Sequence, residues 1–332
     1  MNAPDPILSL LFGSVRARLV YVAAKLGVAD ELSTGPLSLD ELAQRTDTDA
    51  DALLIVLRAL AAERLFEEVE PRVFAVTEVG RPLAEDAPRS RKYDALMFGE
   101  HVDRVFAHVL ESVRTGQPAA PRTFGRPYYE WLNEDADAAR IFNNAMTGGA
   151  RATLPTLLSL DLWRDVESVV DVGGGNGTVL AALLKEHPHL RGVVFDLRHA
   201  ADDARAVLSA EGVADRGAFE AGNFFERVPP GADVYLEVQV LHNWSDEDAV
   251  RVVSRVREAA AETSRLLLIE AVVPDDDPAA AAVVNALSAV WLGGKERVEM
   301  EWRQLLDRGG YRLERITHGE RVAALEARPT AS

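Results

Sequence analysis

Apolar residues recur every three to four positions along the first part of the chain and predict a helix over residues 6–31. The positions concerned are Ile7, Leu10, Leu11, Val15, Leu19, Val22 and Leu26. The stretches 37–46 and 49–66 predict two shorter helices around a turn, and residues 67–80 predict a small hairpin or wing. Helix, turn, helix and wing together indicate a winged-helix-like domain over residues 1–92.

A second helical region covers residues 93–160 and is interrupted at 115–132, where prolines and glycines predict a loop. From about residue 166 short β-branched runs alternate with helical patterns. These runs are ESVVDV, GVVFDL, ADVYLEV, RLLLIEAVV, YRLERI and RVAALEA. Strands that alternate with helices predict a mostly parallel, doubly wound sheet over residues 161–332. The expected fold class is therefore α/β, a Rossmann-like sheet with an N-terminal helical winged-helix-like domain.

The charge balance argues against a nucleic-acid partner. The chain has 332 residues with 53 acidic against 36 basic ones, a formal net charge of −17, whereas DNA is bound chiefly through lysine and arginine. The second short helix begins with Asp49 and Asp51 and carries only Arg58 and Arg64 as bases. An acidic recognition helix is repelled by a duplex, so we expect dimerisation or a lid role for this domain, not DNA binding.

The chain contains no cysteine, which excludes disulfides, thiol catalysis and thiolate metal sites. A cytoplasmic protein is the simplest interpretation. No apolar run reaches the ~18 residues of a membrane span, and the N-terminus lacks the basic region of a signal peptide. We therefore expect neither a membrane partner nor a cleaved leader.

The stretch VVDVGGGNG, residues 169–177, ends a β-branched run and places four glycines within five positions. Its spacing is G-x-G-x-G, with Gly173, Gly175 and Gly177, whereas a dinucleotide-binding loop would need glycine at Thr178. This spacing disfavours a nicotinamide oxidoreductase. A tight turn with close helix packing is the structural alternative, but such a turn needs only one or two glycines. The pattern therefore favours a ligand that lies against the backbone without a pyrophosphate.

Two polar residues follow at the ends of the next strands. Asp196 ends the strand predicted in GVVFDL, where an acid can accept both hydroxyls of a ribose, and Asn223 is expected to end the third strand, in AGNFF. A glycine loop, a ribose-binding acid and a polar residue after the third strand are typical of a class I S-adenosylmethionine site.

Together these motifs resemble one family, the dimeric small-molecule O-methyltransferases that include the caffeic acid and acetylserotonin enzymes and a bacterial natural-product branch. LSLDELAQRT…LRALAAERLF resembles the dimerisation domain of that family, and DVGGGNG and FDLRHA resemble its cofactor motifs. GADVYLEVQVLHNWSDEDA, LLLIEAVV and GGKERVEMEW resemble its catalytic stretches. The resemblance implies a homodimer that uses S-adenosylmethionine and releases S-adenosylhomocysteine. It also implies methylation of a hydroxyl on an aromatic or polyketide-like small molecule, in secondary metabolism such as antibiotic biosynthesis.

Methyl transfer to a phenol, whose pKa is about 10, benefits from a base at neutral pH. His242 follows the fourth predicted strand and is the only histidine that we place at the ligand-binding edge of the sheet. By resemblance His242 is the general base, with Glu270 and Glu296 as its flanking acids. The alternatives are a packed or solvated histidine and, because Lys295 and Arg297 flank Glu296, a salt-bridged acid.

The resemblance also implies the binding residues, with Trp244 covering the adenine. The cofactor set is Asp171, Gly173, Gly175, Asp196, Leu197, Asn223, Phe224, Gln239 and Trp244. The acceptor set is Phe142, Asn143, Met146, Asn243 and Asn285, with Tyr128, Tyr129 and Trp131 nearby. Aromatic and methionine side chains at helical spacing also occur as ordinary core packing, which is the alternative for this helix. No metal is expected, because the histidine and its two acids lie on three separate elements.

The chain departs from the family pattern at several positions. Asn223, Asn243 and Asn285 stand where an aspartate is usual, and Val238 and Gln239 stand where a base is usual; Arg198 and Val298 replace a proline and a threonine. The family also has members that keep the fold and cofactor but hydroxylate, decarboxylate or cyclise, and these typically lack the histidine. Because this chain keeps the histidine and both acids, methyl transfer is favoured and the other chemistries are the alternative.

Overall fold

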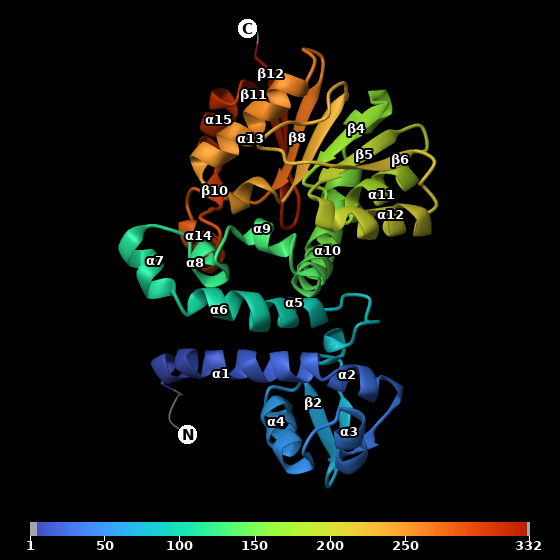
Figure 1. Ribbon diagram of the computed structural model, residues 1–332, viewed down its shortest axis with the longest axis vertical. Helices are drawn as coiled ribbons and strands as arrows, with labels where there is room; N and C mark the ends of the chain where they lie inside the picture. Colours follow the sequence, from blue (N-terminus) through green and yellow to red (C-terminus); the bar gives the residue numbers. More distant parts are fainter. Residues whose placement is uncertain (1–4, 331–332) are drawn as a thin grey trace. The chain divides into compact units, whose positions relative to one another are not determined.

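The computed structural model describes residues 5–330 and divides into two compact units, one extending to Arg104 and the other beginning at Val105 (Figure 1). Each unit has its own core. From the sequence we expected residues 93–160 to form a separate helical region. In the structure this segment forms no unit of its own, because its residues up to Arg104 belong to the first unit and the rest to the second.

The first unit has the expected order of helix, helical pair and hairpin. Its helices are α1 (Pro6–Lys25), α2 (Val28–Glu31), α3 (Leu39–Arg45), α4 (Ala50–Ala62) and α5 (Lys92–Met97), with a π-helical stretch, Phe98–Val102, leading into α6 (Asp103–Phe106). Strand β3 (Val73–Val76) lies between β1 (Leu37–Ser38) and β2 (Phe66–Glu70). The single helix predicted over residues 6–31 is wrong, because Gly27 adopts a φ of 69° that ends α1 and starts α2.

Leucines and phenylalanines of α3, α4 and the hairpin form the core of this unit. The acid that opens α4 has a local structural role, because the side chain of Asp49 accepts a hydrogen bond from Ala52 N–H. The outer face of α1 remains apolar and exposed, from 50 to 79% of each side chain's surface. Its residues are Ile7, Leu8, Leu10, Leu11, Phe12 and Val15.

Helix α1 also has the length and the mean hydropathy, 1.6, of a membrane-crossing segment, which we did not expect from the sequence. A buried core helix and a signal sequence meet the same criterion of length and composition, and only 11% of this stretch of α1 is buried. The apolar face of α1 is therefore available for contact with another apolar surface.

The second unit begins with helices α7 (Val109–Thr115), α8 (Ala120–Phe124), α9 (Tyr128–Leu132) and α10 (Ala136–Leu158). The loop predicted over residues 115–132 is wrong in part, because it contains α8 and α9. Pro121 lies in the first turn of α8, Gly125 ends that helix at a φ of 77°, and Pro127 is the N-cap of α9. The residues that predicted a loop therefore separate two short helices.

A seven-stranded sheet follows in the order β11-β12-β8-β7-β4-β5-β6. Its strands are β4 (Ser168–Val172), β5 (Arg191–Asp196), β6 (Gly217–Ala221), β7 (Val234–Val238), β8 (Arg265–Glu270), β11 (Tyr311–His318) and β12 (Ala323–Pro329). The first five run parallel, and β12 is antiparallel to both β8 and β11. The predicted doubly wound sheet is confirmed. A small parallel pair, β9 (Val272–Val273) and β10 (Arg297–Val298), lies beside it.

Helices cover both faces of the sheet (Figure 1). Helices α10, α11 (Thr178–Glu186) and α12 (Ala201–Ala210) pack on one face, and α13 (Asp246–Ala259) and α15 (Glu299–Arg308) on the other. Helix α14 (Ala282–Trp291) precedes β10 in the chain. The strand order changes direction between β4 and β7, so the carboxyl ends of these strands flank the crevice where ligands bind in such sheets.

Candidate active site

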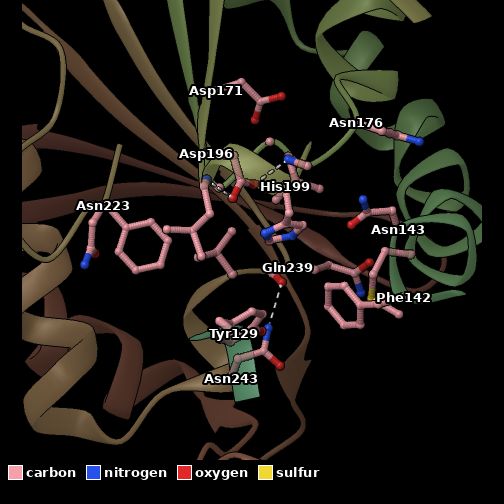
Figure 2. A pocket seen from close by; sticks show the side chains of 18 of the residues that line it. Tyr129, Phe142, Asn143, Asp171, Asn176, Asp196, His199, Asn223, Gln239 and Asn243 are labelled. Carbon is pink, nitrogen blue, oxygen red and sulfur yellow. Dashed lines mark hydrogen bonds between the residues drawn. The ribbon is translucent and has the colours of Figure 1, made fainter. Parts of the chain in front are cut away.

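A cavity of about 380 Å³ opens at the carboxyl ends of the parallel strands and lies entirely within the second unit (Figure 2). It is bounded by α9 and α10 and by the segments that follow β4, β5, β6 and β7. All nine residues predicted to bind the cofactor line this cavity, as do four of the five predicted to bind the acceptor. The exception is Asn285, whose Oδ1 accepts a hydrogen bond from Glu296 N–H at 2.5 Å.

The glycine loop after β4 serves packing and ligand approach at different positions. A side chain at Gly174 would place its Cβ 2.5 Å from Oδ2 of Asp171, so that the buried Asp171 side chain would have to shift. Gly175, at a φ of 55°, has nothing within 4 Å of the corresponding point and lines the cavity. The loop therefore has tight packing at Gly174 and open space on the cavity side at Gly175, and the close approach of a ligand there stays a prediction.

The carboxylate of Asp196, at the end of β5, is fixed against this loop. Its Oδ2 accepts a hydrogen bond from Gly175 N–H at 2.7 Å, and its Oδ1 accepts one from Leu197 N–H at 2.6 Å. Burial raises the pKa of Asp196, and the two backbone bonds oppose that effect. An oriented carboxylate at this strand end is suited to hydroxyl donors of a ligand.

Asp171 of β4 is fully buried, and neither of its carboxylate oxygens has a hydrogen-bond partner within residues 5–330. Burial, helped by the negative charge of Asp196, raises the pKa of Asp171 to about 7. An unpartnered buried carboxylate costs free energy, and such groups in native proteins usually have a functional reason. Because Asp171 also lines the cavity, a cationic or hydrogen-bond-donating ligand group would satisfy it.

The three predicted catalytic residues converge beside the cavity. Nδ1 of His242 lies 3.0 Å from Oε2 of Glu270 and 3.8 Å from Oε1 of Glu296. Oε1 of Glu270 accepts a hydrogen bond from Leu241 N–H at 2.8 Å. None of the three is part of the cavity lining, although Asn243 and Trp244, which follow the histidine directly, are.

Opposing effects act on the protonation of this cluster. Burial lowers the pKa of His242, but the charge and hydrogen bond of Glu270 and the charge of Glu296 outweigh it, so that the pKa is raised. Burial raises the pKa of Glu296, and the charge of His242 partly opposes this. The imidazole therefore lies in a negative environment that stabilises its protonated form.

The bases that flank Glu296 do not neutralise it. Lys295 Nζ lies 3.0 Å from Asp246 and 2.9 Å from Glu301, and Arg297 Nε donates to Asp246 at 2.9 Å. Both bases are therefore directed to other acids. The salt-bridged alternative that we considered for Glu296 does not describe this structure.

Aromatic residues of α9 and α10 divide into cavity walls and packing. The Tyr129 ring lies 5.9 Å from Phe142 and 5.5 Å from Trp244, and all three line the cavity. Trp131 instead stacks on Phe124 at 3.9 Å, and Tyr128 is buried behind the wall. The core-packing alternative therefore holds for Tyr128 and Trp131, whereas Trp244 both lines the cavity and packs on Phe225 at 4.7 Å.

The statement that His242 is the only histidine at this edge is wrong, because His199 follows β5 and lines the cavity. Figure 2 shows His199 beside Asp196 at the cavity. Its Nδ1 lies 3.0 Å from Oδ1 of Asn133, which also lines the cavity. The sequence contained a signal for His199, because it lies only three residues after Asp196, at the carboxyl end of a predicted strand. Asn176 was missed as well, and its Nδ2 donates to the Thr147 hydroxyl at 2.7 Å.

Fold and cavity together define a Rossmann-like methyltransferase with a separate N-terminal unit. Residues 106–312 match the O-methyltransferase domain family, and residues 8–86 match the O-methyltransferase dimerisation domain. The chain belongs to this O-methyltransferase family. The second match identifies residues 8–86 of the winged-helix-like unit as a dimerisation domain of this family.

Similar proteins come from bacterial biosynthesis of natural products. The chain is 34% identical over 325 residues to the phenazine O-methyltransferase PhzM of Lysobacter antibioticus, covering 97% of this chain and 95% of that protein. It is also 36% identical over 270 residues to the aclacinomycin 10-hydroxylase RdmB of Streptomyces purpurascens, covering 80% and 72%. Both O-methylation and hydroxylation therefore occur among its relatives.

Solved structures agree with the fold along the whole chain. The crystal structure of LaPhzM superposes with a TM-score of 0.93 at 34% identity, covering 97% of this chain and 98% of that one. An O-methyltransferase from neocarzinostatin biosynthesis, NcsB1, superposes with a TM-score of 0.84 at 32% identity, covering 94% and 95%. That enzyme was crystallised with S-adenosylmethionine and 2-hydroxy-5-methyl naphthoic acid.

Proposed function

We propose that this protein is an S-adenosylmethionine-dependent O-methyltransferase that acts on a hydroxyl of an aromatic or polyketide-like small molecule in bacterial secondary metabolism. The observation that carries the proposal is the approach of both acids to one nitrogen of His242. Nδ1 faces Glu270 and Glu296, and Nε2 forms no hydrogen bond within residues 5–330. This leaves Nε2 to accept the proton of a hydroxyl.

The cavity fits the cofactor in three respects. Asp171 offers an unpartnered buried carboxylate to the ammonium group, Gly175 allows close approach, and Asp196 can accept ribose hydroxyls. Leu197, Asn223, Phe224, Gln239 and Trp244 complete the set that would hold the nucleoside. When bound, S-adenosylmethionine supplies a methyl group on a positively charged sulfur.

In the proposed mechanism His242 Nε2 takes the proton of the acceptor hydroxyl as the oxygen is methylated. Glu270 holds Nδ1 in its protonated form and stabilises the imidazolium that results, and Glu296 adds negative charge from 3.8 Å. The chain thus supplies positioning and a base, which an in-line displacement needs. Phe142, Asn143, Met146 and Asn243 would position the acceptor ring, while Asn285 would act through the backbone of Glu296.

The protein would work as a homodimer through its N-terminal unit. The apolar face of α1, from Ile7 to Val15, lies within or next to the matched dimerisation domain and exposes six large apolar side chains. Clusters of exposed apolar side chains mark interaction surfaces. An interface between copies also accounts for the high mean hydropathy of α1. A cytoplasmic location, expected from the absence of cysteine, stays a prediction.

A second candidate function is hydroxylation, decarboxylation or cyclisation on the same fold. The relative RdmB, named as a hydroxylase, favours this candidate, as do the departures at Asn223 and Asn243. Retention of His242 with both acids favours methyl transfer. Release of S-adenosylhomocysteine in the presence of an acceptor separates the two candidates.

Calorimetric titration with S-adenosylhomocysteine tests the cofactor site. We expect micromolar binding that Asp196→Ala abolishes, while Asp202→Ala, a fully exposed acid on α12, leaves it unchanged. No binding to the wild-type protein would overturn the proposal. If binding is found, a screen of phenolic acceptors for S-adenosylhomocysteine release, with His242→Ala as control, decides the reaction type.

A further inference from the structure

The charged residues that line the cavity are almost all acidic. Glu130, Asp171 and Asp196 line it, and His199 is the only other titratable side chain apart from Tyr129. Among the described residues that line it, there is neither a lysine nor an arginine. The wall therefore offers no permanent positive charge to a bound molecule.

The bases closest in sequence to the lining are exposed and are not part of it. Arg126, Arg151 and Arg198 are each adjacent to a lining residue, and all three are exposed at the surface. Near the catalytic cluster, Arg297 is fully buried and bound to Asp246 and to the carbonyl oxygens of Leu241 and Trp244. A carboxylate in the cavity would therefore meet no guanidinium or ammonium group of the lining.

The polar groups that do face the cavity are mostly neutral amides. Figure 2 shows the labelled amides of Asn143, Asn176, Asn223, Gln239 and Asn243 on different sides of it. Asn223 and Gln239 belong to the proposed cofactor set, which leaves Asn143 and Asn243 for the acceptor. An amide both donates and accepts, so these two match carbonyl, hydroxyl and amine groups on a ring. The backbone of Gln239 is held at a φ of 53°, a strained conformation of the kind that clusters at functional sites.

We infer that the acceptor of this enzyme is an aromatic molecule without a carboxylate, with neutral oxygen or nitrogen substituents that the amides recognise. The inference rests on the proposed function and names the substrate class of that same site. An unpaired carboxylate loses its hydration on entering the cavity and gains no ion pair from the side chains of the lining in return. The cofactor does not suffer this penalty, because its ammonium and sulfonium groups more than balance its carboxylate.

The family fold does not itself exclude acids, since NcsB1 was crystallised with a naphthoic acid. The preference for a neutral over a carboxylate-bearing acceptor therefore depends on the charges of the residues that line the cavity in this chain. Met146 offers the place to change it, because this side chain of α10 lines the cavity and is 41% exposed. A lysine there would reach the cavity without being buried, and glutamine is the matched neutral substitution.

The test compares 6-hydroxy-2-naphthamide with 6-hydroxy-2-naphthoic acid, which share a ring and a hydroxyl and differ in charge. Binding of each to the full-length protein is measured by calorimetry, with and without S-adenosylhomocysteine. We expect the amide to bind at least about tenfold more tightly than the acid. Met146→Lys should reverse or abolish that preference, and Met146→Gln should keep it.

Equal or tighter binding of the acid to the wild-type protein would overturn the inference, as would failure of the amide to bind. Loss of the preference in Met146→Gln as well as in Met146→Lys would also overturn it, because charge would then not be the cause. The proposed function fails by a different result, the absence of S-adenosylhomocysteine binding. The cofactor titration and the acceptor titrations therefore report on the two proposals separately.

Discussion

Nδ1 of His242 lies 3.0 Å from Oε2 of Glu270, and the other oxygen of that carboxylate holds Leu241 N–H at 2.8 Å. One glutamate at the end of β8 therefore fixes both the imidazole and the backbone turn that carries it. An orienting acid on one ring nitrogen leaves the other nitrogen to react, as in other activated catalytic sites.

His242→Gln should lower kcat by roughly 10² to 10⁴ and leave the Kd for S-adenosylhomocysteine unchanged, because the variant loses the base but not the cavity. Methyl transfer is followed by S-adenosylhomocysteine release, and Kd by calorimetry. His318→Gln, at an exposed position of β11, is the control and should behave as the wild type. Activity of His242→Gln within about threefold of the wild type would remove the histidine from the mechanism.

Glu270→Gln should change the pH dependence as well as the rate. The raised pKa of His242 means that the ring is protonated, and unable to accept a proton, up to a higher pH than an ordinary histidine. Methyl transfer by the wild type should therefore rise with pH through a midpoint above about 6.5. Glutamine removes the negative charge, so the midpoint should move to lower pH while the plateau rate falls.

The measurement is the pH profile of kcat/KM for wild type and Glu270→Gln. Glu258→Gln, an exposed acid on α13, serves as the control and should keep the wild-type midpoint. A midpoint that stays in place in Glu270→Gln would show that another group controls the rate. A higher midpoint would contradict the sign of the electrostatic effect.

The strands of the sheet could be predicted from sequence because their β-branched runs are bounded by turn residues, as in β4, β5 and β8. The boundaries of the helices were harder to predict from the sequence. Gly27 divides a helix whose apolar period continues across it, and only the left-handed backbone there reveals the break. Pro121, Gly125 and Pro127 indicated irregular structure, although each lies at an end of a short helix. Prolines and glycines therefore mark breaks in regular structure, but they do not show whether the residues between two breaks form a loop or a short helix.

The candidate site was predictable where residues follow strands, because carboxyl ends of parallel strands meet at one edge. Asp171, Asp196 and His242 belong to this group. Asn133 and Thr147 line the cavity from the ends and faces of α9 and α10, and their place depends on how these helices pack on the sheet. No local spacing reports that packing, so these residues could not be predicted.

The apolar face of α1 gives a prediction about assembly. Leu10→Glu with Leu11→Glu should shift the protein from dimer to monomer, because two charges would enter an interface made of exposed leucines, isoleucine and phenylalanine. Light scattering coupled to size-exclusion chromatography measures the mass. Val283→Glu, at another exposed apolar position, is the control, and we expect it to stay dimeric. A double variant that remains dimeric at micromolar concentration would place the interface elsewhere.

Asp171→Asn should stabilise the protein at alkaline pH and weaken its cofactor site. The pKa of Asp171 is about 7 in the folded protein, above its value in the unfolded chain. Ionisation of Asp171 therefore lowers the free energy of unfolding as the pH rises, and this loss reaches its full size above about pH 7. Asparagine carries no such charge. The variant's Tm should exceed that of the wild type at pH 8.5, and the difference should shrink towards pH 5. Its Kd for S-adenosylhomocysteine should rise at least about tenfold, because the partner of the ammonium group is lost. Asp161→Asn, an exposed acid, is the control. A Tm difference independent of pH, or unchanged affinity, would contradict this role for Asp171.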